Sequence, residues 1–183
     1  TKYCTNSDFG TFGTIDNKTV LEAADDAARA NWGSSWRMPT DAELTELCEN
    51  CTWIWTIENG VNGYKVTGPN NNSIFLPAAG YRNRSNLDNA GSYYGIYRSA
   101  SLDESYPDNA LGLGFYSSDC YAFSDDRYYG LSVRAVAAVK KEPVPEVNKI
   151  DLGLPSGTLW ADRNVGADSP EAYGDYFAWG ETE

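Results

Sequence analysis

The sequence predicts an α+β domain with two helices early in the chain and short strands after them. Apolar residues recur at helical spacing in two segments before residue 52, and at strand spacing between turn residues beyond it. The 183 residues, 42% of them hydrophobic, suffice for one globular domain with its own core, or for one domain plus a fragment.

Two segments carry helix signals. The first 18 residues are rich in Gly, Thr, Asn and Asp and predict a loop, after which 19–30 has an apolar helical stripe and Gly33 ends the helix. The second helix begins at Thr40, an N-cap residue, and Glu43 completes a capping box. Its apolar positions are spaced i, i+3, i+4, i+7: Leu44, Leu47, Cys48 and Cys51.

That spacing bears on the Cys48-Glu49-Asn50-Cys51 motif. We favour two cysteines on the buried face of the helix, because free cysteine behaves as a small hydrophobic residue. A redox pair and half a zinc site are the alternatives, although the chain has no histidine and only Cys4 and Cys120 besides. A disulfide among the four cysteines stays open if the protein is exported.

Strand signals follow the second helix. Trp53, Trp55 and Ile57 alternate with other residues, and two Asn-Gly pairs, at 59–60 and 62–63, predict turns of a hairpin. A turn at 69–72 precedes an apolar run at 74–76, which Pro77 ends.

The second half of the chain shows weaker periodicity. Residues 81–130 predict loops with short apolar islands, such as 111–115. A strand is expected over 131–139, with Leu131, Val133, Ala135 and Ala137 on one side. We therefore divide the chain into a main part (1–139), a charged, proline-containing linker (140–149) and a final segment (150–183). This segment is too short for a domain, yet its Trp160, Tyr173, Tyr176, Phe177 and Trp179 need a partner surface.

Charge and composition exclude several functions. With 26 acidic and 14 basic residues the net charge is −12, so nucleic acid and anionic membranes are repelled. The lack of histidine excludes Ser-His-Asp and Cys-His nucleophile systems and a His general base. No apolar run is long enough for a transmembrane segment.

Tyrosine is concentrated in one stretch. Nine of the 13 tyrosines lie between Tyr81 and Tyr129, among Asp, Ser, Asn and Gly. This is the composition of a binding loop surface, because tyrosine gives a large contact area for little conformational entropy. The alternative is a β-rich domain in which these tyrosines merely pack.

Six runs of residues carry a family resemblance: Ala27–Gly33, Trp36–Thr40, Phe75–Tyr81, Gly130–Arg134, Asp151–Gly157 and Tyr173–Glu181. They resemble the major paralogous domains of Bacteroidetes surface proteins. That family is similar to the C-type lectin fold, in which two helices lie beside a twisted antiparallel sheet with long irregular loops. The formylglycine-generating enzymes and the variable proteins of diversity-generating retroelements share this fold.

The resemblance implies a diversified ligand-binding surface. In the retroelement proteins, adenine-directed mutagenesis rewrites Asn-type codons ahead of a motif like 130–134. Many relatives have mostly Asn at the positions of Tyr93, Tyr94, Ile96, Tyr116, Asp119, Tyr121, Asp125, Asp126, Tyr128 and Tyr129, and Arg98 and Cys120 fit the same origin. The expected binding surface consists of Tyr93, Tyr94, Tyr97, Arg98, Tyr116, Asp119, Tyr121, Asp126, Tyr128 and Tyr129.

The segment order departs from the family, in which the counterpart of 151–183 comes first. We expect a permuted arrangement in which this segment completes the same fold, with a domain-swapped dimer and the start of a tandem domain as alternatives. The partner would be a protein or glycan on another cell or phage, and the location extracellular or at the cell surface.

The expected role is binding without catalysis or a cofactor. A structural or pilus-tip module, a formylglycine-generating-like enzyme and a carboxylate-based enzyme are the alternatives. The sugar-binding signatures of calcium-dependent lectins are missing, so Ca²⁺ is a minor alternative that acidic loops could still supply.

Overall fold

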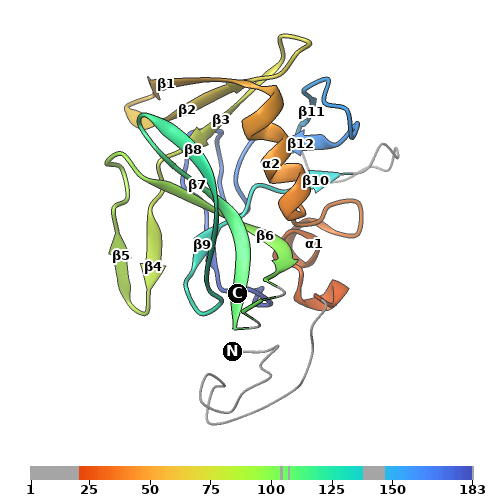
Figure 1. Ribbon diagram of the computed structural model, residues 1–183, viewed down its shortest axis with the longest axis vertical. Helices are drawn as coiled ribbons and strands as arrows, with labels where there is room; N and C mark the ends of the chain where they lie inside the picture. The colour runs from red at the N-terminus through yellow and green to blue at the C-terminus, as the bar shows by residue number, and fades with distance from the viewer. Residues whose placement is uncertain (1–20, 104, 107, 138–146, 183) are drawn as a thin grey trace.

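The computed structural model describes residues 21–103, 105–106, 108–137 and 147–182 (Figure 1). Over these ranges it is α+β, with helices η2 (Ala23–Asp25, 3-10), α1 (Ala27–Trp32) and α2 (Asp41–Asn50). The strands are β1 (Thr52–Glu58), β2 (Val61–Thr67), β3 (Ser73–Pro77), β4 (Tyr81–Asn83), β5 (Asn86–Asp88), β6 (Gly95–Leu102), β7 (Asn109–Tyr116), β8 (Asp119–Asp126), β9 (Leu131–Ser132), β10 (Val136–Ala137), β11 (Lys149–Asp151), β12 (Leu159–Ala161) and β13 (Tyr176–Phe177).

The strands form four small sheets, in the orders β1-β2-β3, β10-β12-β11, β13-β9-β6-β7-β8 and β4-β5. All these pairings are antiparallel except that of β6 with β9. The mostly antiparallel sheets with two α-helices agree with the predicted class.

The first predicted helix is interrupted. The predicted loop over 1–18 and the first two residues of the predicted helix, 19–20, lie outside the described residues. Asp26 has extended backbone angles (φ −83°, ψ 111°), so a continuous helix from 21 to 30 is wrong and α1 begins at Ala27. The Asp26 carboxylate accepts the backbone N–H groups of Arg29 and Met38, which an uninterrupted helix would not allow. Gly33 ends α1 as predicted, with φ 87°.

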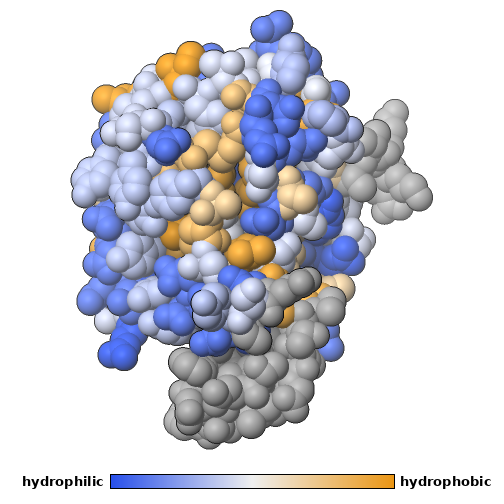
Figure 2. All heavy atoms as spheres, viewed as in Figure 1, coloured by the Kyte–Doolittle hydropathy of each residue, from blue (hydrophilic) through white to orange (hydrophobic). Residues whose placement is uncertain are grey.

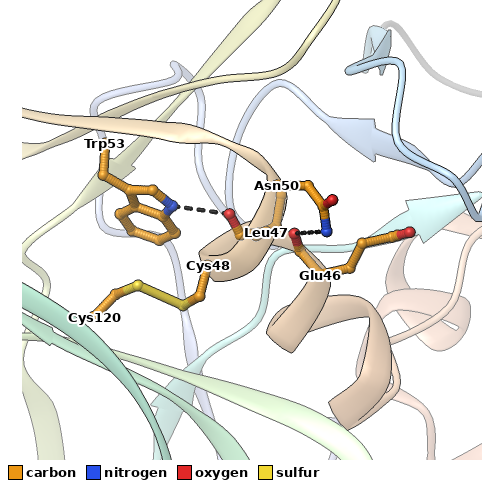
Figure 3. Close-up of a disulfide and its surroundings, with 6 residues drawn as sticks. All are labelled: Glu46, Leu47, Cys48, Asn50, Trp53 and Cys120. Carbon is orange, nitrogen blue, oxygen red and sulfur yellow. Dashed lines mark hydrogen bonds between the residues drawn. A yellow bond between two sulfur atoms is a disulfide. The ribbon is translucent and has the colours of Figure 1, made fainter.

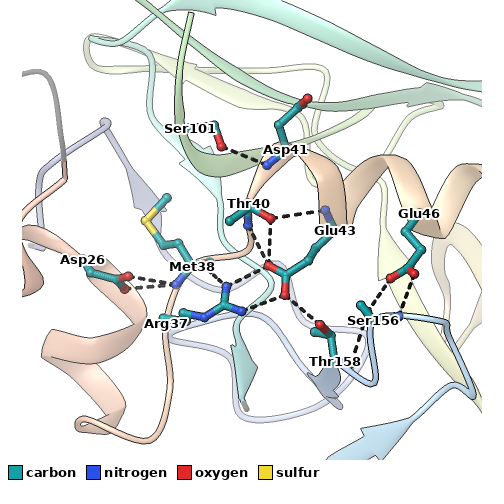
Figure 4. Close-up of polar contacts among 10 residues, drawn as sticks. All are labelled: Asp26, Arg37, Met38, Thr40, Asp41, Glu43, Glu46, Ser101, Ser156 and Thr158. Atoms are coloured by element: carbon teal, nitrogen blue, oxygen red, sulfur yellow. Dashed lines mark hydrogen bonds and ion pairs between the residues drawn. The ribbon is translucent and has the colours of Figure 1, made fainter.

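Helix α2 begins as predicted, with Thr40 and Glu43 forming a capping box (Figure 4). Leu44 and Leu47 are buried and pack against Tyr64, Leu113 and Phe115, which makes α2 the cover of the central core. Figure 2 shows apolar side chains gathered between β8 and α2, flanked by hydrophilic ones.

The β1–β2 hairpin turns at Asn59 and Gly60, both with positive φ (47° and 85°), as the Asn-Gly signal predicts. The second predicted turn, at 62–63, is wrong, because Gly63 lies inside β2 opposite Thr56 and Pro77. A side chain there would collide with Phe75, so this glycine serves close packing rather than a turn. The turn at 69–72 and the strand over 74–76 are confirmed, with Pro77 the last residue of β3.

The described residues of 81–130 form five strands, β4 to β8, so the prediction of loops there is wrong. The alternation of apolar and polar residues that indicates a strand is not visible in β7, because glycines occupy alternate positions there. Aromatic rings from β8 fill the space above these glycines. A Cβ at Gly112 would meet the ring of Phe123, and one at Gly114 would meet Tyr121.

The predicted strand over 131–139 is two short strands, β9 and β10, and residues 138–139 lie outside the described part. Residues 131–137 are all buried, and Val133, Ala135 and Ala137, which were predicted to share one side, pack in one buried cluster. Val136 packs into the central core instead, so both sides of the segment are covered. The final segment also bonds to its backbone: the N–H of Val165 donates to the carbonyl of Val133, and that of Ala161 to Ala135.

The final segment completes two sheets of this chain. Strand β12 lies between β10 and β11, and β13 pairs with β9. Trp160 and Trp179 are fully buried. Helix α2 also holds the segment: Thr158 donates to Glu43 and Ser156 to Glu46 (Figure 4). Strand β11 begins within the predicted 140–149 linker, of which 140–146 lies outside the described residues.

Candidate binding surface

Strands β6, β7 and β8 present two different faces. Side chains alternate along a strand, and Leu113 and Phe115 of β7 point into the core beneath α2. Gly114 and Tyr116 therefore point to the opposite face, and so does Tyr121, which pairs with Gly114 from β8. Tyrosines from different parts of the tyrosine-rich stretch come together on this outer face.

Seven tyrosines form one chain of ring contacts. Ring centroids lie 4.8 Å apart for Tyr94 and Tyr116, 6.0 Å for Tyr93 and Tyr116, and 5.8 Å for Tyr116 and Tyr121. Tyr81 joins Tyr94 (6.1 Å) to Tyr129 (5.7 Å), and Tyr128 lies 4.5 Å from Tyr129. We call this set the tyrosine cluster: Tyr81, Tyr93, Tyr94, Tyr116, Tyr121, Tyr128 and Tyr129.

The cluster is open to solvent at three points. Tyr93, Tyr116 and Tyr128 keep 54%, 42% and 48% of their surface exposed, while the other four are half-buried. Six of the cluster's tyrosines were predicted site residues. Asp119 is exposed at the turn between β7 and β8, and Asp126 is half-buried at the end of β8.

Tyr97 does not belong to the surface, which corrects the prediction. It lies in the core with 1% exposure, where its hydroxyl donates to the carbonyl of Pro77 (2.9 Å). Burial raises the pKa of Tyr97 to about 12. Ile96, which the family resemblance implied to be a diversified position, is also buried.

Arg98 is likewise no surface residue, because its exposure is 0%. Its guanidinium donates to the carbonyls of Asp126 (3.0 Å) and Tyr129 (3.1 Å), and more weakly to Ala110 (3.4 Å). Burial lowers its pKa to about 9, although Asp125 and Asp126 oppose the shift. Arg98 is therefore a positioning residue for the turn that carries Tyr128 and Tyr129.

Sequence reasoning left Tyr81 and Asp125 out of the site. Tyr81 is distant along the chain, and strand β4 brings it in, because Arg82 exchanges two backbone hydrogen bonds with Gly130. Both residues had carried a signal: Tyr81 lies in the tyrosine-rich stretch, and the family resemblance implied that Asp125 is a diversified position.

A pocket of about 200 Å³ lies within the cluster. We call it the tyrosine pocket; it is lined by Tyr81, Asn89, Tyr94, Ile96, Tyr116, Asp125 and Tyr129. Its aromatic walls come from four different parts of the chain, so it exists only in the folded protein.

Three tyrosines of the cluster, Tyr81, Tyr94 and Tyr121, have a raised pKa, which favours the neutral phenol form. Burial raises the pKa of Tyr81 and Tyr94, and nearby carboxylates, Asp125 for both, raise it further. Burial and hydrogen bonds to Tyr94 and Tyr116 raise the pKa of Tyr121. At neutral pH these hydroxyls can therefore both donate and accept hydrogen bonds.

The cysteines lie beneath this surface. Cys48 of α2 and Cys120 of β8 form a disulfide across 72 residues of sequence, which fixes β8 to the helix (Figure 3). Cys51 is a free thiol, and burial, with the charge of Glu46, raises its pKa to about 11. The Cys48-Cys51 motif is therefore not joined as a redox pair here.

No group of three or more His, Cys, Asp or Glu side chains among the described residues is arranged to hold a metal ion. The described part of the chain contains no helix that is long and apolar enough to cross a membrane. No family model, curated protein or solved structure matches the chain.

Proposed function

We propose that this protein is a recognition module that binds a protein or glycan ligand through the tyrosine cluster. The observation that carries the proposal is the chain of contacts among seven tyrosines, three of them well exposed, on the outer face of a sheet whose other face is covered by α2. Such a rigid aromatic surface loses little entropy on binding.

We further propose that the α+β fold is C-type lectin-like with a permuted segment order. Two helices beside mostly antiparallel sheets support this, as does the pairing of β12, in the final segment, with β10 of the main part. The linker would then connect the two positions that are the N- and C-termini in the unpermuted fold. Diversification would act on the strands and turns that carry the tyrosine cluster.

The disulfide supports a location outside the cytoplasm, at the cell surface or beyond, because disulfides persist in oxidising compartments. It also places Cys48 in a structural bond, which supports binding rather than cysteine-based catalysis.

The direct test uses fluorescent protein on a glycan array and a displayed peptide library. The Tyr93→Ala/Tyr116→Ala double variant should lose at least ~10-fold of the binding signal. Tyr106→Ala, which removes a 64% exposed tyrosine outside the cluster, should retain it. Equal signals from all three proteins, or none from the wild type, would contradict the proposal.

The retroelement origin has a separate test in the genome. The locus should carry a reverse transcriptase gene and a template repeat that aligns with the codons of 93–129. A locus without them would contradict that part of the proposal and leave the binding proposal intact.

A further inference from the structure

Strand β1 has an open edge, on the far side of α2 from the final segment's sheet. It is the outer strand of its sheet, with β2 on one side and no described strand on the other. Its pairing with β2 runs without interruption from Thr52 to Glu58, so no bulge bends the edge away from solvent. The strand therefore presents a straight, seven-residue backbone edge.

Backbone groups of every second residue point to this edge. Bonded and non-bonded residue pairs alternate along two antiparallel strands. Asn62 of β2 lies opposite Ile57, but its carbonyl accepts the N–H of Ala78 on the β3 side. Ile57 is therefore in a non-bonded pair, and by alternation so are Trp55 and Trp53. The N–H and carbonyl groups of these three residues point away from β2.

The edge lacks the usual protection against strand pairing. Natural edge strands are blocked by lysine, proline or bulges, whereas residues 52–58 contain no lysine or proline and carry one charge, Glu58, at the end. Ile54 and Ile57 keep 55% and 63% of their surface exposed, and Figure 2 shows apolar residues on the surface near β1. The other long edge strand, β8, carries three aspartates and is joined to α2 by the disulfide.

The strand is complementary to itself in antiparallel pairing. A two-fold axis at Trp55 would place Trp55 opposite its own copy and Trp53 opposite Ile57 of the second copy. All three residues with open backbone groups would then pair with one another. On this face Trp53 and Trp55 are only half-buried, and the exposed Ile57 of the second copy would cover Trp53. Aromatic and β-branched side chains in such pairs stabilise a sheet.

The opposite face and the charges also favour a second copy. The same register would place Ile54 opposite Thr56 and Glu58 opposite Thr52, so each carboxylate meets a neutral side chain. Two chains with a net charge of −12 repel one another over most of their surface. Because β1 contains one charged residue, it is a place where two copies can approach.

We propose that two copies of the protein associate through β1, forming an antiparallel β1–β1 ladder about a two-fold axis at Trp55. The final segment completes sheets of its own chain, so this dimer needs no domain swap. It does not depend on the ligand of the tyrosine cluster, and it brings two such clusters into one assembly. A single pair of strands is a small interface, so the dimer is reversible.

The first test measures association of the wild-type protein. Sedimentation velocity from about 1 μM to about 1 mM, in ~0.3 M NaCl to screen the net charge, should show a monomer–dimer equilibrium. Hydrogen exchange followed by NMR locates the interface. The N–H groups of Trp53, Trp55 and Ile57 should exchange at least ~3-fold more slowly at about 1 mM than at about 50 μM, while those of β5 should not change.

Matched variants test the edge itself. Ile54→Glu should weaken the dimer at least ~10-fold, because it removes an exposed apolar side chain and adds a charge to each strand. Leu87→Glu adds the same charge at a 43% exposed position of β5 and should leave the dimer intact. Ile57→Pro removes an N–H that faces solvent in the monomer, so it should weaken the dimer as strongly and retain the fold, which thermal melts check.

Three outcomes would overturn the proposal. The first is a monomer at every concentration. The second is a dimer that Ile54→Glu and Ile57→Pro leave unchanged, which would be built on another surface. The third is a monomer whose β1 amides become protected only on addition of a ligand selected on the glycan array or from the peptide library, which would assign the edge to that ligand. None of these outcomes bears on the array test of the tyrosine cluster.

Discussion

Two fully buried arginines show how the core of this molecule differs from the region beside the tyrosine cluster. Arg134 donates to the Asn164 side chain (2.9 Å) and to the carbonyls of Ala161 (3.2 Å) and Phe75 (2.8 Å), all inside the core. Arg98 donates to carbonyls of a turn near the surface, and its Nε has no hydrogen-bond partner.

Burial lowers the pKa of both, of Arg134 to about 10 and of Arg98 to about 9. The core arginine connects three separate parts of the chain, whereas the other mainly sets the position of one turn. On the tyrosine-cluster side, a single buried side chain therefore holds the turn that carries Tyr128 and Tyr129.

The largest expected effect comes from Arg134→Met. It removes the donors that Arg134 supplies to the Asn164 oxygen and to two carbonyls in the core, so the free energy of unfolding should fall by about 3–5 kcal/mol. Urea denaturation followed by tryptophan fluorescence measures it. Arg134→Lys keeps the positive charge but offers a single ammonium group where three guanidinium nitrogens donate, so it should recover only part of the lost free energy. A loss below ~1 kcal/mol for Arg134→Met would show that the network is dispensable.

Arg98→Met should cost less, about 1–3 kcal/mol, because the freed carbonyls of Asp126 and Tyr129 lie where water can reach them. Hydrogen exchange should accelerate mainly over 126–130, with the core amides protected. Uniform acceleration across the chain would mean that Arg98 supports the core as Arg134 does.

Local signals predicted the elements that local physics determines. The capping box of Thr40 and Glu43 and the Asn59-Gly60 turn each satisfy their backbone within a few residues, and both were found in place. The break at Asp26 was not predictable, because its carboxylate bonds to Met38, 12 residues away.

In the candidate site, too, local sequence signals were predictive and long-range contacts were not. Composition indicated the tyrosine-rich stretch, but not which members face outward. Tyr97 points to the core under α2, while Arg98 points outward and is buried by the turn that it holds. Both outcomes depend on contacts with residues 20 or more positions away, which a single sequence does not reveal.

Lowering the pH should test the hydrogen bonds of Glu43, which join α2 to the final segment. Burial alone would raise the pKa of Glu43, but hydrogen bonds from Arg37, Thr158 and the Thr40 N–H hold it at about 2. Because the folded-state pKa lies below the unfolded value, this stabilisation is complete above about pH 4.5 and is lost as the pH falls towards 2.

Glu43→Gln should therefore have a lower Tm than the wild type at pH 7, and the two Tm curves should converge between pH 4.5 and 2. Thermal melts across this range measure the effect. Glu49→Gln, at an exposed position of the same helix, should run parallel to the wild type. Parallel curves for Glu43→Gln would show that the hydrogen bonds do not favour the ionised carboxylate.

The smallest effect is expected at the surface that we propose as the binding site. Tyr93 is 54% exposed and its ring stacks on Tyr116, so Tyr93→Ser should change the free energy of unfolding by no more than about 0.5 kcal/mol. Urea denaturation beside Arg98→Met gives the comparison under one condition. A loss above ~1 kcal/mol would mean that the tyrosines stabilise the fold by packing, since a surface free to vary its residues cannot also carry the stability of the domain.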